Sequence, residues 1–282
     1  MKSVLLPTDF SENSWNAIKY ALRFFKDEPC VFYLLHVHTL DLSVINSPSY
    51  GDPGIAIEDV YTKPSKTRLL RILKQIAKTH HNSLHHFYTT VDFGFFIDVI
   101  RKHVDEKEID VIVMGTKGAS GLKKMIIGSN AGDVIVKVKC TTLIVPEDAS
   151  FKDIEEIAFP TDFSAFNNYK TLKPLMDVLD RFRSKLSILH VGKGLKELNL
   201  DQLENRELLQ DFFEAFKHEF FFLSNPKLEE AVQCFTESRG ISMIAMVAKN
   251  LNYFQQILFH SRTESISYHT KIPFLVLHET NQ

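Results

Sequence analysis

Short apolar runs alternate with helical patterns along the first half of the chain. The runs fall at about residues 2–6, 31–37, 86–92, 109–114 and 142–146, and the helical patterns at about 12–26, 60–80, 95–107 and 129–139. The apolar runs are continuous, which is typical of parallel strands that are covered on both faces. We therefore predict an α/β fold with a doubly wound, five-stranded parallel sheet, which would bind a ligand at the carboxyl ends of its strands.

The same order of segments recurs in the second half. Residues 7–11 and 160–164 both read Pro-Thr-Asp-Phe-Ser, and each copy follows a short apolar run and precedes a helical pattern. Tyr33–Val37 likewise matches Ser187–Val191. Because several matches occur in the same order, the pattern indicates duplication, with domains at 1–148 and 149–282. Ser11 or Asn13 is expected to cap the helix after the first copy.

Glycine is scarce in this chain but crowded in one place. The 282 residues include 11 glycines, of which five lie between positions 115 and 132. Gly115, two residues, Gly118, nine residues, Gly128 and Ser129 lead into a predicted helix. Glycine lets a backbone approach a ligand closely, and a helix N-terminus offers free amides to an anion. The spacing therefore favours a phosphate site, and the alternative is a surface loop followed by a capped helix.

Composition excludes several classes of protein. The net charge is −2, so there is no basic surplus of the kind that nucleic-acid binders carry. No apolar run reaches the 18 residues that a membrane helix needs, so no membrane partner is expected. Cys30, Cys140 and Cys234 lie far apart without a Cys-x2-Cys spacing, which indicates a reducing environment. We expect a cytoplasmic protein.

With these motifs in place, the chain resembles a tandem member of the universal stress protein family. The opening strand with Pro-Thr-Asp-Phe-Ser is typical of that family, and the Gly-x2-Gly-x9-Gly-Ser spacing is the signature of its ATP-binding branch. The resemblance covers nearly the whole chain. It implies two adenine-nucleotide alpha-hydrolase-like domains with strand order 3-2-1-4-5. It also implies a nucleotide-dependent regulator or switch in the response to stress.

The resemblance also implies a set of residues around bound ATP. They are Pro7, Thr8, Asp9, Val37, Met114, Gly115, Gly118, Gly128, Ser129 and Asn130. Asp9 would lie beside the ribose and adenine, and Val37 would hold the adenine through its backbone. The last four residues would cradle the phosphates, whose oxygens Mg²⁺ would bridge. Ala131 departs from the hydroxyl residue of many relatives, which removes at most one contact.

The second half is expected to have lost this site. From about His86 onward the halves align with an offset of 132 and no gap, so Val247, Asn250 and His260 replace the three signature glycines. A valine resists the positive φ that a glycine adopts, and its side chain would fill the space of the ligand. Asp162 would then be structural, turning its strand into the next helix.

Three further expectations concern association and activity. Paired domains of this family associate through their last strands, here Thr141–Val145 and Ile272–Leu277. A homodimer and an unidentified protein partner are left open. No nucleophile–base–acid set can be defended, which favours binding over turnover, although a slow metal-dependent ATPase is an alternative. Residues 40–63 include Pro48, Gly51, Pro53 and Gly54 and are expected to form a loop. A second alternative is a nucleotide-free interaction module that docks through this loop or through the Phe-rich helical pattern that begins at Phe212.

Other candidate residues have structural interpretations. Phe212, Phe213, Phe216 and Phe220 have helical spacing and are expected to pack in a core or between domains. The histidines His80, His81, His85 and His86 suggest a metal site, but a solvated helix end explains them more simply. His36 and His190 would pack beside the sheet, and Cys140 and Cys234 would be buried.

Overall fold

The computed structural model describes most of the chain. The described residues are 1–38, 62–116, 129–164, 169–192, 198–225, 227–248 and 271–278. The predicted 40–63 loop lies outside them, except for Thr62 and Lys63, and so do Gly118 and Gly128.

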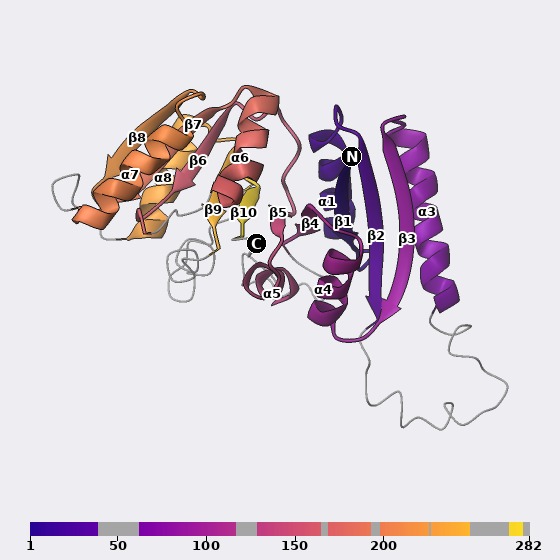
Figure 1. Cartoon of the computed structure of the whole chain (residues 1–282). Coiled ribbons are helices and arrows are strands. Elements are labelled where there is room, and N and C mark those ends of the chain that lie inside the picture. Colours follow the sequence, from indigo (N-terminus) through magenta and orange to yellow (C-terminus); the bar gives the residue numbers. More distant parts are fainter. Residues whose placement is uncertain are drawn as a thin grey trace.

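Strands and helices alternate in the first half, close to the predicted positions (Figure 1). The strands are β1 (Lys2–Pro7), β2 (Cys30–His38), β3 (His85–Phe93), β4 (Val111–Gly115) and β5 (Thr141–Val145). The helices are α1 (Glu12–Phe24), α3 (Lys63–Thr79), α4 (Phe96–Glu106) and α5 (Ser129–Lys137). The side chain of Ser11 accepts from the amide of Ser14, so the first of the two candidate caps is confirmed.

The second half repeats this order. Its strands are β6 (Glu156–Pro160), β7 (Lys185–Val191), β8 (His218–Leu223), β9 (Met243–Val247) and β10 (Phe274–Leu277). Its helices are α6 (Tyr169–Phe182), α7 (Leu200–Phe212) and α8 (Leu228–Arg239). A tandem duplication fits this arrangement, and the boundary between residues 148 and 149 stays a prediction.

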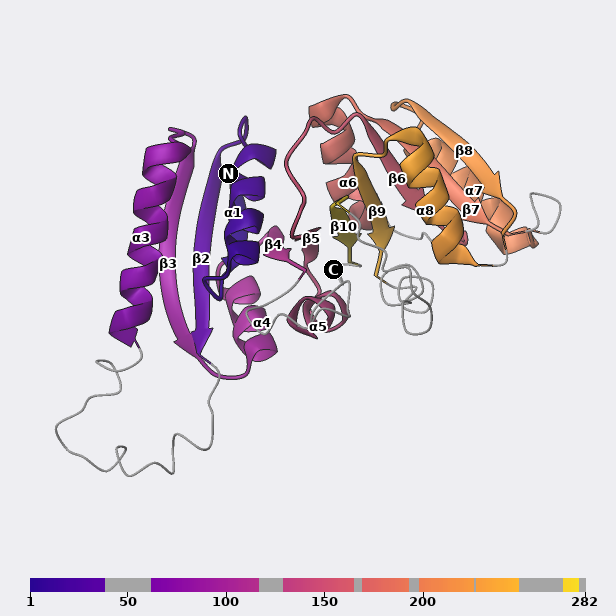
Figure 2. The ribbon, with the colours of Figure 1, turned by 180° about the vertical axis from the view of Figure 1, so that it is seen from behind.

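One ten-stranded sheet runs through both halves, in the order β3-β2-β1-β4-β5-β10-β9-β6-β7-β8. The first five strands have the expected order 3-2-1-4-5, and the last five have its mirror order. β5 and β10 pair antiparallel, with Leu143 opposite Leu275. The two halves therefore lie side by side in both ribbon views (Figures 1 and 2), joined by the last-strand contact that the resemblance implied.

The strands are apolar on both faces because helices cover both sides of the sheet. Val4 and Leu6 belong to one buried cluster, and Leu5, which points the opposite way, belongs to the other. All three are 0% exposed. This confirms the prediction of a parallel sheet covered on both faces. None of the helices in the described ranges is long and apolar enough to cross a membrane.

The strand pairings show how many positions separate equivalent residues of the two halves. Val4 pairs with Val111 and Ile157 pairs with Met243, so β9 lies 132 positions after β4, as predicted. The prediction that the two halves align without a gap from about His86 onward is wrong at β8. His36 pairs with Val91 but His190 pairs with Phe222, which makes the offset 131 at β8. One extra residue therefore lies between β8 and β9.

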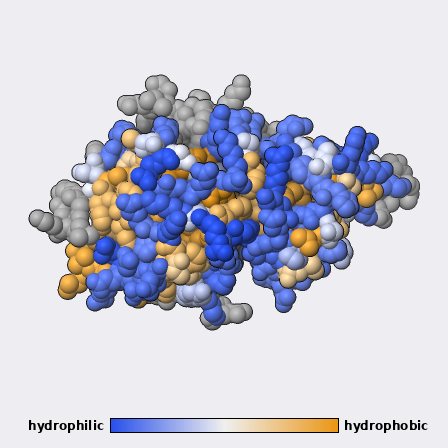
Figure 3. Space-filling view, turned by 90° about the horizontal axis from the view of Figure 1, so that it is seen from above, coloured by the Kyte–Doolittle hydropathy of each residue, from blue (hydrophilic) through white to orange (hydrophobic). Residues whose placement is uncertain are grey.

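The Phe-rich segment is not a continuous helix. α7 ends at Phe212, Phe213 is its C-cap, and Phe220 lies on β8. The helical spacing is therefore wrong as a structural prediction, because a turn separates the two elements. The predicted role in packing is confirmed, since Phe213 is fully buried in a core cluster. Hydrophobic residues also gather at the surface on the left of Figure 3, over the second half.

Two predictions about histidine and cysteine need correction. His85 is not part of a solvated helix end: it begins β3, is buried, and its Nε2 lies 3.0 Å from the carbonyl oxygen of Phe25. Cys140 is buried as predicted, whereas Cys234 is exposed on α8. His85 was misplaced because the sequence did not show that α3 ends at Thr79 and that β3 begins at His85, whereas Cys234 lies in the middle of α8 on its exposed face.

Aromatic rings pack between the halves on the α1 side of the sheet. Phe151, in the segment that connects β5 to β6, lies 5.3 Å from Tyr20, 6.4 Å from Phe24 and 6.1 Å from Phe182, measured between ring centroids. Arg181 of α6 lies over Phe24 at 5.0 Å. The two halves therefore share buried side chains besides the shared sheet.

Arg181 also holds the two halves together through polar contacts. Its Nη2 lies 2.8 Å from Oε1 of Glu28, and its Nη1 donates to the carbonyl oxygen of Phe24 at 3.1 Å. The side chain of Arg181 is 12% exposed and that of Glu28 is 28% exposed, so this pair is screened less than a surface pair.

Replacing Arg181 with alanine is expected to lower the free energy of unfolding by about 2 kcal/mol, because Glu28 and the Phe24 carbonyl lose a partly buried donor. Chemical denaturation of the full chain measures this value. Arg181→Lys keeps the charge but not the fork of donors, so a smaller loss is expected. Equal stability of Arg181→Ala and wild type would show that the contact contributes nothing.

Candidate functional site

The candidate site lies at the carboxyl ends of β1 and β4. β1 pairs with β2 on one side and with β4 on the other, so the chain changes direction across the sheet at this point. Ligands of open α/β sheets bind at such a switch point. Pro7 ends β1 and Gly115 ends β4, which places the Pro-Thr-Asp-Phe-Ser turn beside the start of the glycine motif.

Thr8 anchors the turn that follows β1. It is 5% exposed, and its amide donates to the carbonyl oxygen of Leu35 at 2.8 Å. Its hydroxyl accepts from the amide of Phe10 at 3.0 Å and lies 2.9 Å from the hydroxyl of Ser14. Because these hydrogen bonds hold the backbone of the turn, they also orient the next residue, Asp9.

Asp9 forms a tight turn with Ser11. Its Oδ1 accepts from the amide of Ser11 at 3.0 Å and from the hydroxyl of Ser11 at 2.6 Å. Asp162 makes the same two bonds with Ser164, at 2.9 and 2.7 Å. The structural role expected for Asp162 is therefore confirmed, and Asp9 has that role too. Turn geometry by itself does not distinguish the two halves.

His36 supports the same turn from β2. Its Nδ1 donates to the carbonyl oxygen of Thr8 at 2.8 Å, and His190 repeats this contact with Thr161 at 3.1 Å. Burial lowers the pKa of His36, and the bond to the Thr8 carbonyl only partly opposes this effect. Both histidines therefore pack beside the sheet, as predicted.

Gly115 is required by close packing against α1. A Cβ atom at this position would lie 2.7 Å from Oδ1 and 2.8 Å from Cγ of Asn13, which is nearer than side chains pack. The φ angle of Gly115 is not in the left-handed region, so the expected conformational reason is wrong at this position. Glycine is needed at position 115 because the Asn13 side chain of α1 packs directly against it, and the sequence spacing did not indicate this contact.

Val37 lies next to Asp92 of β3, which contacts residues of α4. Its strand partner is Asp92, whose carboxylate accepts from the Phe93 amide at 2.9 Å and from Lys102 Nζ at 3.2 Å, with His103 Nε2 at 3.3 Å. Burial raises the pKa of Asp92, but these contacts outweigh it and hold the pKa below its usual value. Asp92 is therefore a carboxylate committed to its own neighbours.

The described site residues meet at one edge of the sheet. Pro7, Thr8 and Asp9 follow β1, Val37 lies near the end of β2, and Met114 and Gly115 end β4. α5 begins at Ser129, and Asn130 is exposed in its first turn. Gly118 and Gly128 lie outside the described ranges, as do their counterparts Asn250 and His260.

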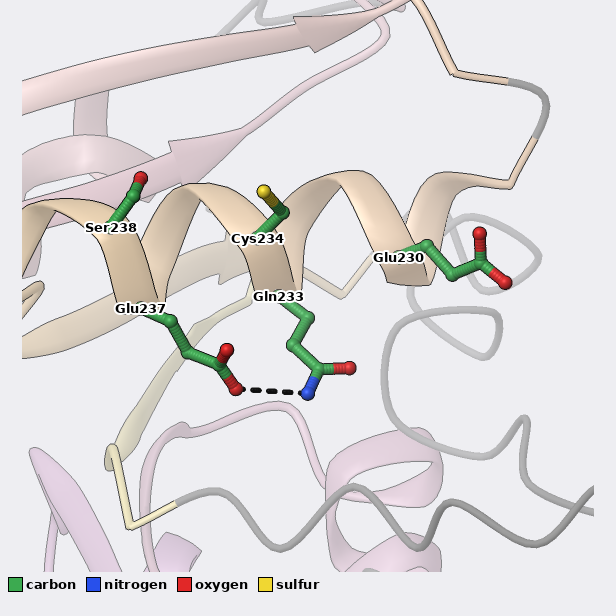
Figure 4. A pocket seen from close by; sticks show the side chains of 5 residues that line it. All are labelled: Glu230, Gln233, Cys234, Glu237 and Ser238. Carbon is green, nitrogen blue, oxygen red and sulfur yellow. Dashed lines mark hydrogen bonds between the residues drawn. The ribbon is translucent and has the colours of Figure 1, made fainter.

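A separate surface hollow of about 510 Å³ lies along α8. It is lined by Glu230, Gln233, Cys234, Glu237 and Ser238, all from this one helix (Figure 4). Gln233 Nε2 donates to Glu237 Oε1 at 2.9 Å. Among the described residues, the lining comes from α8 alone and includes none of the sequence motifs, so this hollow is not the candidate site.

Within the part of the chain that the structure describes, no group of three His, Cys, Asp or Glu side chains is placed to hold a metal ion.

Comparisons with known proteins agree with this architecture. The model of the universal stress protein family matches residues 1–146. Universal stress protein MJ0531 of Methanocaldococcus jannaschii is 29% identical over 144 residues, covering 51% of this chain and 81% of that protein. Universal stress protein MJ0577 of the same organism is 27% identical over 158 residues, covering 51% and 94%.

A solved structure matches over both halves. The universal stress protein from Archaeoglobus fulgidus aligns with 97% of each chain at a TM-score of 0.69 and 19% identity, which supports the whole fold. The family model covers more than half of the chain and includes the strand edge described above. The chain belongs to the universal stress protein family.

Proposed function

We propose that the first half binds ATP at the carboxyl ends of β1 and β4, and that this binding makes the chain a nucleotide-dependent switch in the response to stress. The observation that carries the proposal is the meeting of the Asp9 turn and the end of β4, where the Gly-x2-Gly-x9-Gly-Ser motif begins. α5 begins where that motif ends, and its N-terminal amides suit a phosphate.

The chemistry of the site fits an adenine nucleotide. Asp9 offers a carboxylate to ribose hydroxyls, and the backbone of Val37 offers amide and carbonyl groups to adenine. Gly118, Gly128, Ser129 and Asn130 would hold the phosphates. Since no cluster of metal ligands exists among the described residues, Mg²⁺ would enter with the phosphate oxygens.

In the second half, the contacts at the carboxyl ends of β6 and β9 argue against nucleotide binding. Val247 stands at the end of β9, where the first half has Gly115. Gln202 Nε2 donates to the carbonyl oxygen of Asp162 at 2.8 Å, and Asn205 Nδ2 donates to that of Phe163 at 2.9 Å. α7 therefore lies against the turn and occupies backbone groups there. We propose that this half has a supporting role.

Replacing Asp9 with alanine is expected to weaken ATP binding about tenfold, because a charged hydrogen-bond acceptor is removed from the ribose end of the site. Titration calorimetry of the full chain measures the affinity. Asp162→Ala is the matched control, since it breaks the same two bonds in the other half. It should leave ATP affinity unchanged at similar stability.

A phosphate-release assay on the same samples separates a binding protein from an ATPase. Tight binding with negligible release supports the switch. Metal-dependent release that Asp9→Ala abolishes would instead support the enzyme. Equal losses in Asp9→Ala and Asp162→Ala would contradict the placement of the site in the first half.

A further inference from the structure

Phe10 has an unusual backbone at the centre of the proposed site. Its φ is +65°, a left-handed conformation that costs free energy for a bulky side chain. This conformation turns the chain so that the Phe10 amide meets the Thr8 hydroxyl and the Ser11 amide meets the Asp9 carboxylate. If Phe10 relaxed, both bonds would weaken and the Asp9 carboxylate would lose its fixed direction.

The ring of Phe10 contacts two side chains from other elements. The His36 ring lies 4.4 Å away, measured between centroids, and His36 itself is bonded to Thr8. The guanidinium carbon of Arg68, on α3, lies 4.1 Å from the ring centroid. This distance is within the range of a cation–π contact. Arg68 is an exposed residue of α3, and it contacts the ring of Phe10, whose backbone is in the left-handed conformation.

The second half secures the same backbone differently. Phe163 has a φ of +58°, but it is fully buried, its ring stacks on His190 at 5.0 Å, and its carbonyl accepts from Asn205. Arg206 of α7 lies over Phe220 instead, at 4.8 Å. An arginine on the equivalent helix thus reaches a different ring, and among the described residues a cation lies over the left-handed phenylalanine of the first half but not over that of the second.

We propose that Arg68 is a positioning residue of the first-half nucleotide site, which acts through Phe10 to fix the Asp9 turn. This inference rests on the proposed function. Arg68 would set the affinity for the nucleoside end of the ligand without touching its phosphates. Loss of an exposed cation–π contact predicts a fall in affinity of about two- to fivefold in Arg68→Ala.

Four matched measurements test this role by calorimetry on the full chain. Arg68→Ala should lower the affinities for ATP, ADP and AMP by the same factor. Arg68→Lys should lose less affinity than Arg68→Ala because it keeps a cation. Arg206→Ala, which breaks the similar contact in the other half, should change none of the affinities. In a Phe10→Leu background, Arg68→Ala should have no further effect, because the ring through which it acts is gone.

Amide hydrogen exchange without nucleotide gives an independent readout. The amides of Phe10 and Ser11 should exchange faster in Arg68→Ala than in wild type, and at the wild-type rate in Arg206→Ala. Unchanged affinity in Arg68→Ala would overturn the inference. So would a loss that grows with the number of phosphates, since that would make Arg68 a direct phosphate ligand. A wild-type chain that binds none of the nucleotides would instead overturn the proposed function, and this inference with it.

Discussion

A Gly115→Val chain is expected to bind ATP at least about 30-fold more weakly than wild type and to be less stable by about 1–3 kcal/mol. The added Cβ would lie 2.7 Å from Asn13 Oδ1, and Asn13 is only 6% exposed near the start of α1. Either this side chain or the helix must move. Because α1 begins directly after the Asp9 turn, such a movement would displace both sides of the proposed site.

The role of Asn13 can be tested by compensation. Gly115→Ala introduces the same Cβ, and adding Asn13→Ala removes the atoms that it would meet. The double variant should therefore lose less stability than the sum of the two single variants, as measured by denaturant titration. ATP binding by Gly115→Val at wild-type affinity would contradict the proposed site.

Stability is expected to fall by about 3 kcal/mol between neutral pH and pH 4 because of His278. This residue follows β10 and is 9% exposed, and its buried Nε2 has no hydrogen-bond partner among the described residues. Burial, aided by the charge of Lys139, lowers its pKa from 6.5 to about 4. Since the unfolded chain takes up the proton first, the folded state loses stability as pH falls from 6.5 to about 4.

A His278→Gln variant isolates this effect from the carboxylates that titrate at the acid end. The unfolding free energies of variant and wild type should be measured across the same pH series. The difference between them should change by about 1.4 kcal/mol per pH unit within the window and stay constant above it. Parallel pH profiles would show that the pKa of His278 is the same in the folded and the unfolded chain.

Local pattern was sufficient to predict the elements that form the sheet. β1, β2, β4 and β5 are continuous apolar runs because both of their faces are buried. The repeated Pro-Thr-Asp-Phe-Ser segment located the strand-to-helix turns because its Asp and Ser side chains bond to each other in both halves. The pairing of β5 with β10 followed from the family resemblance alone.

Contacts between distant segments could not be predicted in the same way. Apolar spacing suggested one helix through Phe220, but a turn after Phe213 places Phe220 on β8. The spacing also gave no indication that Asn13 fills the space beside Gly115, or that Arg68 lies over Phe10. Each of these contacts joins elements far apart in the chain, and only the folded sheet brings them together.

In the proposed function, one half of this chain binds ATP and the other half does not. The number of ATP molecules bound per chain, measured by native mass spectrometry of the full-length protein in the presence of Mg²⁺ and ATP, tests it most directly. We predict a single ATP per chain, lost in Gly115→Val and kept in Asp162→Ala. Two ATP molecules per chain, or none, would contradict the account.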